Sequence, residues 1–347
     1  MVKVYRPLQR IFSGVFLAGL IIILITAAVS WRILESPMNV LASNEWLIVP
    51  PGTTLTRLVD DLSERGILKT PRLLSLYGRL SGEATRIQAG EYLIQDESTP
   101  RQLLKQLVNG EVYLHQITVV EGWRFNEFLA ALREHDAIDS NSLDTNTVME
   151  FLGNENLHPE GLFFPDTYRF SRGTPALEIL KQSYEVMGER LGLVWSRYRA
   201  TSVLKSSYEV LILASIIEKE TGLVEERHRI AGGFHRRLER GMHLQADPTV
   251  IYGLGDEFNG NLRREDLTRD APYNTYTRVG LPPTPIALPG EDALVAAVDP
   301  APGSELYFVA TGRGDGGHYF STTLEEHNVA VARYLQQIRM PADEGAR

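Results

Sequence analysis

An uncharged run of 19 residues, Ile11–Val29, constrains this chain more than any other stretch of its sequence. At about 1.5 Å per residue, a helix of this length crosses a hydrocarbon core of about 30 Å. Lys3, Arg6 and Arg10 precede the run, and Trp31 follows it in the position of an interfacial anchor. Positive charge before a membrane helix favours a cytoplasmic N-terminus. The sequence therefore predicts a single transmembrane helix, with the remainder of the chain outside the cytoplasm.

A cleaved signal peptide is the alternative, since Ala28-Val29-Ser30 has the small residues of a cleavage site. The apolar run is long for a signal peptide, which favours a retained anchor in the cell inner (cytoplasmic) membrane and a periplasmic or otherwise extracytoplasmic domain. The expected parts are a cytoplasmic N-terminus (1–10), a transmembrane helix (11–31), a linker (32–45), a small module (46–120), a larger domain (121–340) and a disordered tail (341–347).

Composition excludes several classes of function. The chain has 347 residues, a formal net charge of −9 and no cysteine. This length suits two or three domains. The acidic balance argues against nucleic acid as a partner. Without cysteine there are no disulfides, thiolate metal sites or cysteine nucleophiles.

The small module reads as a compact α+β unit in the order β-α-α-β-α-β. Its expected strands are 46–49, 90–94 and 112–120. Its helices begin at Thr53 or Thr54, at Thr70-Pro71 and at Thr99-Pro100, and the first and third end at Gly66 and Gly110. We expect the second helix to turn the following residues inward: Leu73, Leu74, Tyr77 and Leu80.

The opening of this module, from Trp46 to about Leu68, resembles the LysM peptidoglycan-binding module. The resemblance rests on a strand followed by Pro51-Gly52-Thr53-Thr54-Leu55 and a helix. A generic α+β packing module is the alternative.

The larger domain, also α+β, is organised around Ser206–Thr221. Ser206 and Glu209 have the spacing of a capping box, and Val210–Ile217 is apolar except for Ser215. A helix that is apolar all round is buried, so Glu218 at its end either reaches the surface or enters a cleft. By the step of about 100° per residue, Glu218 and Glu220 lie roughly 200° apart and cannot act as a carboxylate pair. Other expected elements are helices at 124–134 and 174–199, strands at 306–310 and 318–320, and a last helix from Thr322 or Thr323 to Ile338.

The sequence contains no motif for metal binding, for serine catalysis or for phosphate binding. There is no His-Glu-x-x-His, and His228, His235 and His243 lie among arginines, which suits an exposed basic helix and no metal site. The chain lacks a Gly-x-Ser-x-Gly elbow, and its Gly-rich segment 312–317 lacks the Lys-Ser/Thr ending of a phosphate loop. We expect no cofactor.

Loops rich in amide, hydroxyl, carboxyl and aromatic side chains surround this helix in the sequence, and such groups suit a groove that binds sugar. A glutamate with a raised pKa is the usual acid for glycosidic cleavage. The candidate substrate-binding residues are Gln245, Asp247, Thr249, Tyr273, Asn274, Tyr276, Glu160 and His318. Structural alternatives are a helix N-cap at Asp247–Thr249, core aromatic packing for the two tyrosines and a structural histidine.

Four motifs together resemble the membrane-bound endolytic murein transglycosylases. They are Ala214-Ser215-Ile216-Ile217-Glu218-Lys219-Glu220-Thr221, Leu244-Gln245-Ala246-Asp247-Pro248-Thr249-Val250-Ile251-Tyr252-Gly253, Tyr273-Asn274-Thr275-Tyr276 and Gly280-Leu281-Pro282-Pro283. The resemblance implies that residues 121–340 are a catalytic domain that cleaves nascent peptidoglycan between N-acetylmuramic acid and N-acetylglucosamine, leaves 1,6-anhydromuramyl ends and terminates glycan elongation. It implies that Glu218 is the catalytic residue, with penicillin-binding synthases and other wall-elongation proteins as partners.

A lytic enzyme of this kind needs one acid/base, because the sugar's own 6-hydroxyl replaces water. Two alternatives remain. One is a muramidase with two carboxylates, in which Asp247 or Glu160 is the second acid. The other is a glycan-binding adaptor of the wall-synthesis machinery without catalytic activity.

Overall fold

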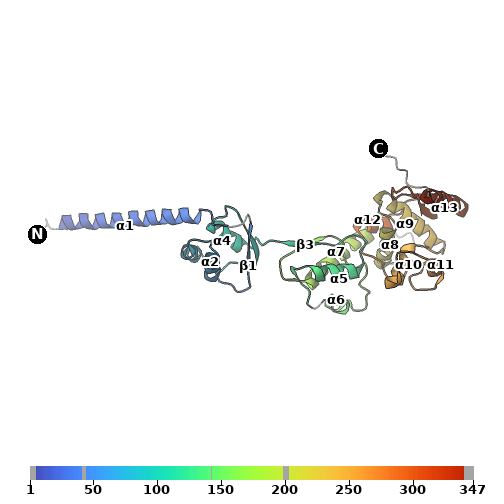
Figure 1. Ribbon diagram of the computed structural model, residues 1–347, viewed down its shortest axis with the longest axis horizontal. Coiled ribbons are helices and arrows are strands. Elements are labelled where there is room, and N and C mark those ends of the chain that lie inside the picture. The colour runs from blue at the N-terminus through green and yellow to red at the C-terminus, as the bar shows by residue number, and fades with distance from the viewer. Residues whose placement is uncertain (1–4, 41–43, 142, 198–202, 340–347) are drawn as a thin grey trace. The chain divides into compact units, whose positions relative to one another are not determined.

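A computed structural model describes residues 5–40, 44–141, 143–197 and 203–339 of the chain. It divides into two compact units, Met1–His115 and Gln116–Arg347 (Figure 1). The structure has a mixed α+β composition, as the sequence predicts. The predicted tail, 341–347, lies outside the described residues.

The first helix, α1 (Tyr5–Leu34), contains the apolar run. Within the described part of the chain, its segment Gly14–Leu34 is the helix long and apolar enough to cross a membrane, with a mean hydropathy of 2.4. Apart from Leu34 at its end, the large apolar side chains of this segment are exposed, unlike those of a core helix. Such a segment is consistent with a membrane anchor or a signal sequence.

The rest of the first unit is built on two antiparallel strands, β1 (Asn44–Val49) and β2 (Gly90–Gln95), with Trp46 opposite Leu93. Its helices are α2 (Leu55–Glu64), α3 (Pro71–Leu80) and α4 (Pro100–Asn109). Thr54 caps α2, Thr99 forms a capping box on α4, and Gly110 ends α4 in the left-handed conformation at φ 66°. The predicted starts of all three helices are confirmed.

Two predictions for the small module, 46–120, are wrong. Leu80 is 80% exposed, because it is the last residue of α3 and lies beyond the turn that packs inward through Leu74 and Gly78. The strand expected over 112–120 is only β3 (His115–Thr118). Before it, Tyr113 N donates to Glu91 O without continuing the ladder.

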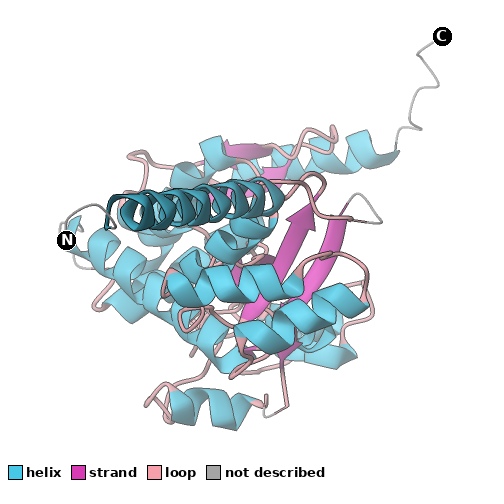
Figure 2. Cartoon of the chain, turned by 90° about the vertical axis from the view of Figure 1, so that its left-hand side faces the viewer, coloured by secondary structure: helices cyan, strands magenta, loops and turns pink. Residues whose placement is uncertain are grey.

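The second unit contains three sheets of two strands each in the described part of the chain: β3 with β5 (Thr167–Phe170), β4 (Ile138–Asp139) with β6 (Thr174–Pro175), and β7 (Tyr307–Ala310) with β8 (His318–Ser321). Figure 2 shows the strands in magenta among the cyan helices. Its helices are α5 (Phe125–Glu134), α6 (Thr145–Phe151), α7 (Ala176–Arg197), α8 (Ser207–Glu220), α9 (Val224–Glu239), α10 (Asp247–Leu254), α11 (Arg264–Thr268), α12 (Glu291–Val298) and α13 (Leu324–Arg339), with the short η1 (Gly255–Glu257) after α10.

Helix α8 is the centre of this unit, as its sequence predicts. Residues Val210–Ile217 are all buried, and α7, α9, α10 and α12 pack around them. Ser206 caps the helix by accepting from Glu209 N at 3.2 Å. The reciprocal half of the predicted capping box is wrong, because the Glu209 carboxylate accepts from Lys205 N instead of Ser206 N.

Helix α9 differs from the exposed basic helix that the sequence suggests. His235 is 4% exposed and its Nε2 lies 2.8 Å from Ala297 O. Arg227 and Arg237 are buried too. Their guanidinium groups donate hydrogen bonds, that of Arg227 to a carboxylate and that of Arg237 to backbone carbonyl oxygens. The arginine-rich pattern alone indicates an exposed helix, because it does not show which groups bind each arginine.

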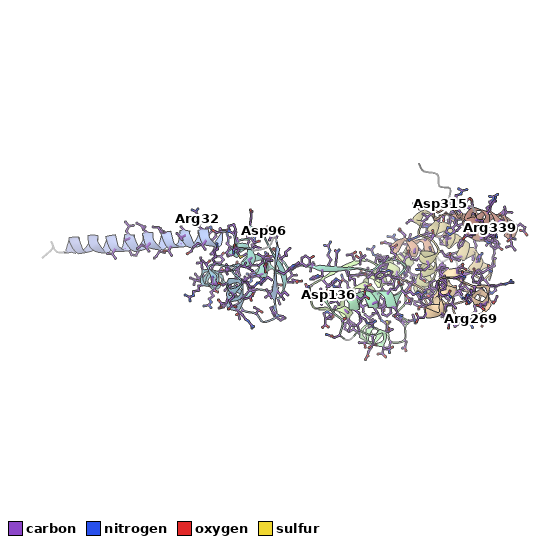
Figure 3. All side chains as sticks on the ribbon, in the orientation of Figure 1. Arg32, Asp96, Asp136, Arg269, Asp315 and Arg339 are labelled. Carbon is purple, nitrogen blue, oxygen red and sulfur yellow. The ribbon has the colours of Figure 1, made fainter. Side chains whose placement is uncertain are left out.

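A hairpin and a helix end the described chain. Strands β7 and β8 pair antiparallel, with Tyr307 opposite Ser321, and the turn between them contains Asp315, labelled in Figure 3. Thr323 caps α13 by accepting from Glu326 N at 3.2 Å. Helix α13 packs against both strands.

Candidate active site

The last turn of α8 carries two acids in separate surroundings. Glu218 Oε1 accepts from Arg227 Nη2 at 3.0 Å, and Glu218 Oε2 accepts from Gly290 N at 3.0 Å. The side chains of Glu218 and Arg227 are 6% and 5% exposed. Burial raises the pKa of Glu218, whereas the Gly290 hydrogen bond and the Arg227 charge oppose that shift. Both oxygens of Glu218 are therefore committed to partners within the protein.

Neighbouring polar residues of α8 also bind nearby backbone. Ser215 Oγ accepts from Ile286 N at 3.0 Å, and Lys219 Nζ donates to Gly122 O at 3.1 Å. With Glu218, these residues attach α8 to α9, to the loop before α5 and to the N-cap of α12. The contacts of this face of α8 hold the helix in place within the second unit.

Glu220 lines a cavity of about 530 Å³. Burial, together with the nearby Asp247 charge and against the opposing Arg237 charge, raises the pKa of Glu220 to about 8. Among the described residues, no hydrogen bond to its carboxyl group is found. The cavity is lined by Glu220, Arg237, Leu244, Gln245, Asp247, Tyr276, Tyr307, Phe308, Val309, Ala310, His318, Leu324, His327 and Tyr334.

Contacts between side chains fix the shape of this cavity. The Tyr276 hydroxyl donates to Asp247 Oδ1, and Arg237 Nη1 donates to Gln245 Oε1 at 3.2 Å. Gln245 adopts φ 51°, the left-handed region that non-glycine residues rarely occupy. Such strain persists only where surrounding structure fixes it, and it is concentrated at functional sites.

Four of the predicted substrate-binding residues meet in this cavity: Gln245, Asp247, Tyr276 and His318. They line this cavity together with Glu220, and Glu218 is not among the lining residues. His318 Nδ1 lies 2.7 Å from Glu226 Oε2, so its ring is held by an acid of α9.

Two other predicted residues are buried structural groups. Thr249 is fully buried, and its hydroxyl donates to Ala246 O at 2.7 Å. The Asn274 side-chain amide donates to the carbonyls of Asp266, Leu267 and Arg269 and so binds the end of α11. Neither lines the Glu220 cavity. Their polar groups satisfy backbone or neighbouring hydroxyl groups, which sequence alone does not show.

Glu160 and Tyr273 lie in a second polar cluster. Glu160, 4% exposed, accepts from Phe125 N at 2.9 Å and from the Tyr252 hydroxyl at 3.1 Å. Burial raises the pKa of Glu160 to about 7. The Tyr273 ring lies against Tyr252, with centroids 4.9 Å apart, and its hydroxyl lies 2.8 Å from Thr284 Oγ1. These contacts belong to the packing of α5 and α10.

Four cavity residues were not predicted from the sequence: Glu220, Arg237, Tyr307 and His327. One signal for Glu220 was present. Its stripe on α8, Leu213–Ile216–Ile217, is wholly apolar, whereas the stripe that leads to Glu218 contains Ser215. No comparable local signal marks Tyr307 or His327, because only the hairpin and α13 bring them to the cavity.

Comparisons with known proteins agree with this architecture. The model of the YceG-like family matches residues 47–333. A Bacillus subtilis protein named endolytic murein transglycosylase is 32% identical over 307 residues, which cover 83% of this chain and 84% of that protein. A Streptococcus pneumoniae protein of the same name is 27% identical over 321 residues, covering 83% of this chain and 58% of that protein.

Among solved structures, a yceG-like protein from Listeria monocytogenes matches with a TM-score of 0.53 and 27% identity, over 82% of this chain and 98% of that one. The resemblance to endolytic murein transglycosylases that the motifs predict is confirmed by these matches. The chain belongs to the YceG-like family.

Proposed function

We propose that this chain is a membrane-anchored lytic transglycosylase that cleaves nascent peptidoglycan between N-acetylmuramic acid and N-acetylglucosamine. Glu220 is its acid and base, and the products carry 1,6-anhydromuramyl ends. The observation that carries the proposal is the Glu220 carboxyl group, which lines a polar and aromatic cavity and has its pKa raised to about 8. A carboxylic acid that stays protonated at neutral pH is ready to donate a proton to a leaving group.

The proposed reaction needs no second carboxylate. Glu220 gives its proton to the glycosidic oxygen as the bond from that oxygen to C1 of N-acetylmuramic acid breaks. The 6-hydroxyl oxygen of the same sugar then bonds to C1, and the hydroxyl proton returns to Glu220. The acid is regenerated and water is not consumed.

Surrounding residues support this assignment. Tyr276, Tyr307 and Phe308 give the cavity aromatic rings, and Gln245 gives it an amide. Aromatic rings with a few placed polar groups are typical of ligand sites. Glu218, which the family resemblance implied as the catalytic residue, has both oxygens occupied by Arg227 and Gly290. We therefore assign Glu218 to positioning the end of α8.

The biological setting is proposed on the same basis. The apolar α1 anchors the protein in the cell inner membrane, with the cavity on the periplasmic or extracytoplasmic side. There the enzyme would end glycan elongation beside the penicillin-binding synthases that extend the strand.

We assign a glycan-holding role to the first unit, in keeping with its LysM-like opening. Trp46 and Tyr113, 44% and 41% exposed, place their rings edge to face with centroids 4.8 Å apart. Exposed aromatic rings of this kind suit stacking on sugar faces. Trp46→Ala in the full chain should weaken binding to isolated peptidoglycan without lowering kcat, and unchanged binding would reduce this unit to a spacer.

A muramidase that uses two carboxylates is the second candidate, because Asp247 lines the same cavity as Glu220. Mass spectrometry of the muropeptides released by the detergent-solubilised protein separates the two. Anhydromuramyl ends support the lytic reaction, and reducing ends support hydrolysis. Binding of glycan without cleavage would favour an adaptor and contradict both.

A further inference from the structure

Helix α13 forms one wall of the Glu220 cavity, to which it contributes Leu324, His327 and Tyr334. The His327 ring stacks on Tyr307, with centroids 5.2 Å apart and an interplanar angle of 24°. The Arg237 guanidinium lies 5.1 Å from the Tyr307 ring centroid. Residues from α9, β7 and α13 therefore hold His327 in one orientation.

Hydrogen bonding distinguishes His327 from its neighbours. Asp247 has Tyr276 as a partner, Gln245 has Arg237, and His318 has Glu226. His327 Nδ1 is buried and, in the part of the chain that the structure describes, has no hydrogen-bond partner. A buried N–H without an acceptor is costly, which favours the tautomer with the proton on Nε2.

The charge state of the ring limits it to one N–H. Burial and the positive charge of Arg237 both lower the pKa of His327, so the imidazole is neutral at neutral pH. Among the described residues, Nε2 has neither a protein partner nor a place among the buried unpaired atoms. His327 thus has a single N–H donor available at a cavity wall.

We propose that His327 is a further substrate-binding residue, whose Nε2–H donates a hydrogen bond to an oxygen of an amino sugar in the Glu220 cavity. This inference rests on the proposed function. Amino sugars offer two kinds of acceptor, a hydroxyl oxygen and the acetamido carbonyl oxygen. The stack on Tyr307 fixes the imidazole, so little side-chain freedom is lost when the hydrogen bond forms.

The test measures the affinity of full-length protein in detergent for purified peptide-free glycan strands, in a Glu220→Gln background. His327→Phe keeps a ring on Tyr307 without the donor, and His327→Gln restores an N–H near Nε2. A neutral hydrogen bond is worth about 0.5–1.5 kcal/mol, so the Phe variant should bind about 2- to 13-fold more weakly. The Gln variant should recover most of that loss. Asn328→Ala, an exposed neighbour on α13, is the control.

Each result decides the proposal. Weakening by Phe with recovery by Gln supports it. If strands lacking their N-acetyl groups lose the effect, the acceptor is the acetamido oxygen; if they keep it, the acceptor is a hydroxyl. Equal affinity of the Phe variant and its parent, or equal weakening by Phe and Gln, overturns the proposal. Should the Phe variant fail to fold, His327→Met takes its place. Failure of the proposed function is distinguishable, because it shows as absence of cleavage by the wild type.

Discussion

Glu218 and Glu220 are two residues apart on α8, yet one is bound to Arg227 at 3.0 Å and the other lines a cavity of about 530 Å³. The helical repeat explains the separation, since a step of two residues turns the side chain by about 200°. The same motif therefore supplies a structural acid to one side of the helix and a candidate catalytic acid to the other.

Substituting the two acids separately should affect different properties, cleavage in one case and stability in the other. Glu220→Gln keeps the size of the side chain but removes the acid, so cleavage should fall by about 10²–10⁴-fold with folding intact. Glu218→Gln leaves the buried Arg227 charge with only the half-exposed Glu121 carboxylate, 3.7 Å away, which should lower the free energy of unfolding by up to about 3–5 kcal/mol. Muropeptide release and thermal unfolding measure the two effects.

Near wild-type cleavage by Glu220→Gln would end the assignment of Glu220. A fully folded Glu218→Gln protein that had lost all cleavage would restore Glu218 as the acid, which is the role its family resemblance implied.

The Glu218–Arg227 pair should also show strong coupling. Arg227 Nε and Nη1 are buried without a partner among the described residues, so the pair satisfies its own hydrogen bonds only in part. Replacing both residues, with Glu218→Gln and Arg227→Met, removes the buried charge altogether. We expect the double variant to be more stable than the sum of the single losses predicts, by about 1 kcal/mol or more. Additive losses in chemical unfolding would show that the pair contributes no specific interaction.

Glu160 makes stability depend on pH in a defined direction. Its pKa is raised from 4.5 to about 7 by burial, so the native state binds the proton more tightly than the unfolded chain. Its contribution to stability is complete below about pH 4.5 and is lost as the pH rises to about 7, by up to roughly 3 kcal/mol. Glu160→Gln should remove this dependence and raise the melting temperature at pH 8 relative to wild type. Equal pH profiles for the two proteins would show that Glu160 titrates normally.

Much of the fold followed from local sequence signals. Thr54, Thr99 and Gly110 mark helix ends because capping depends on the residue itself and its near neighbours. The buried α8 followed from its apolar run. Leu80 was misplaced because the apolar pattern does not show where a helix stops packing against the core.

The candidate site was harder to predict, because contacts between residues distant in the sequence decide which side chains line the cavity. Asn274 and Thr249, predicted to bind substrate, donate hydrogen bonds to backbone carbonyls that the sequence does not indicate. The Glu218 carboxylate accepts from Gly290 N, a group 72 residues further along the chain that no local pattern indicates. Local pattern identified the segments of the site, and tertiary contacts decided which of their side chains face the cavity.

Membrane topology remains a prediction from charge. Lys3, Arg6 and Arg10 precede the apolar helix, which favours an N-terminus in the cytoplasm. A reporter enzyme that is active only outside the cytoplasm, fused after Arg347, should therefore be active. Reversing the charges of the three residues should reduce that activity. A reporter active in the cytoplasm would contradict both the topology and the proposed substrate.

The pH dependence of cleavage should reflect the protonation of Glu220 in its cavity. Glu220 must be protonated to act as an acid, so kcat/KM should fall above about pH 8, about tenfold per pH unit.

The Asp247 charge contributes to the raised pKa of Glu220. Asp247→Asn removes that charge while its side-chain oxygen still accepts from Tyr276, so the alkaline limb should move to lower pH with the maximal rate retained. Loss of activity at every pH would instead identify Asp247 as a second catalytic carboxylate and favour the muramidase. An unmoved alkaline limb would show that Asp247 does not act on Glu220.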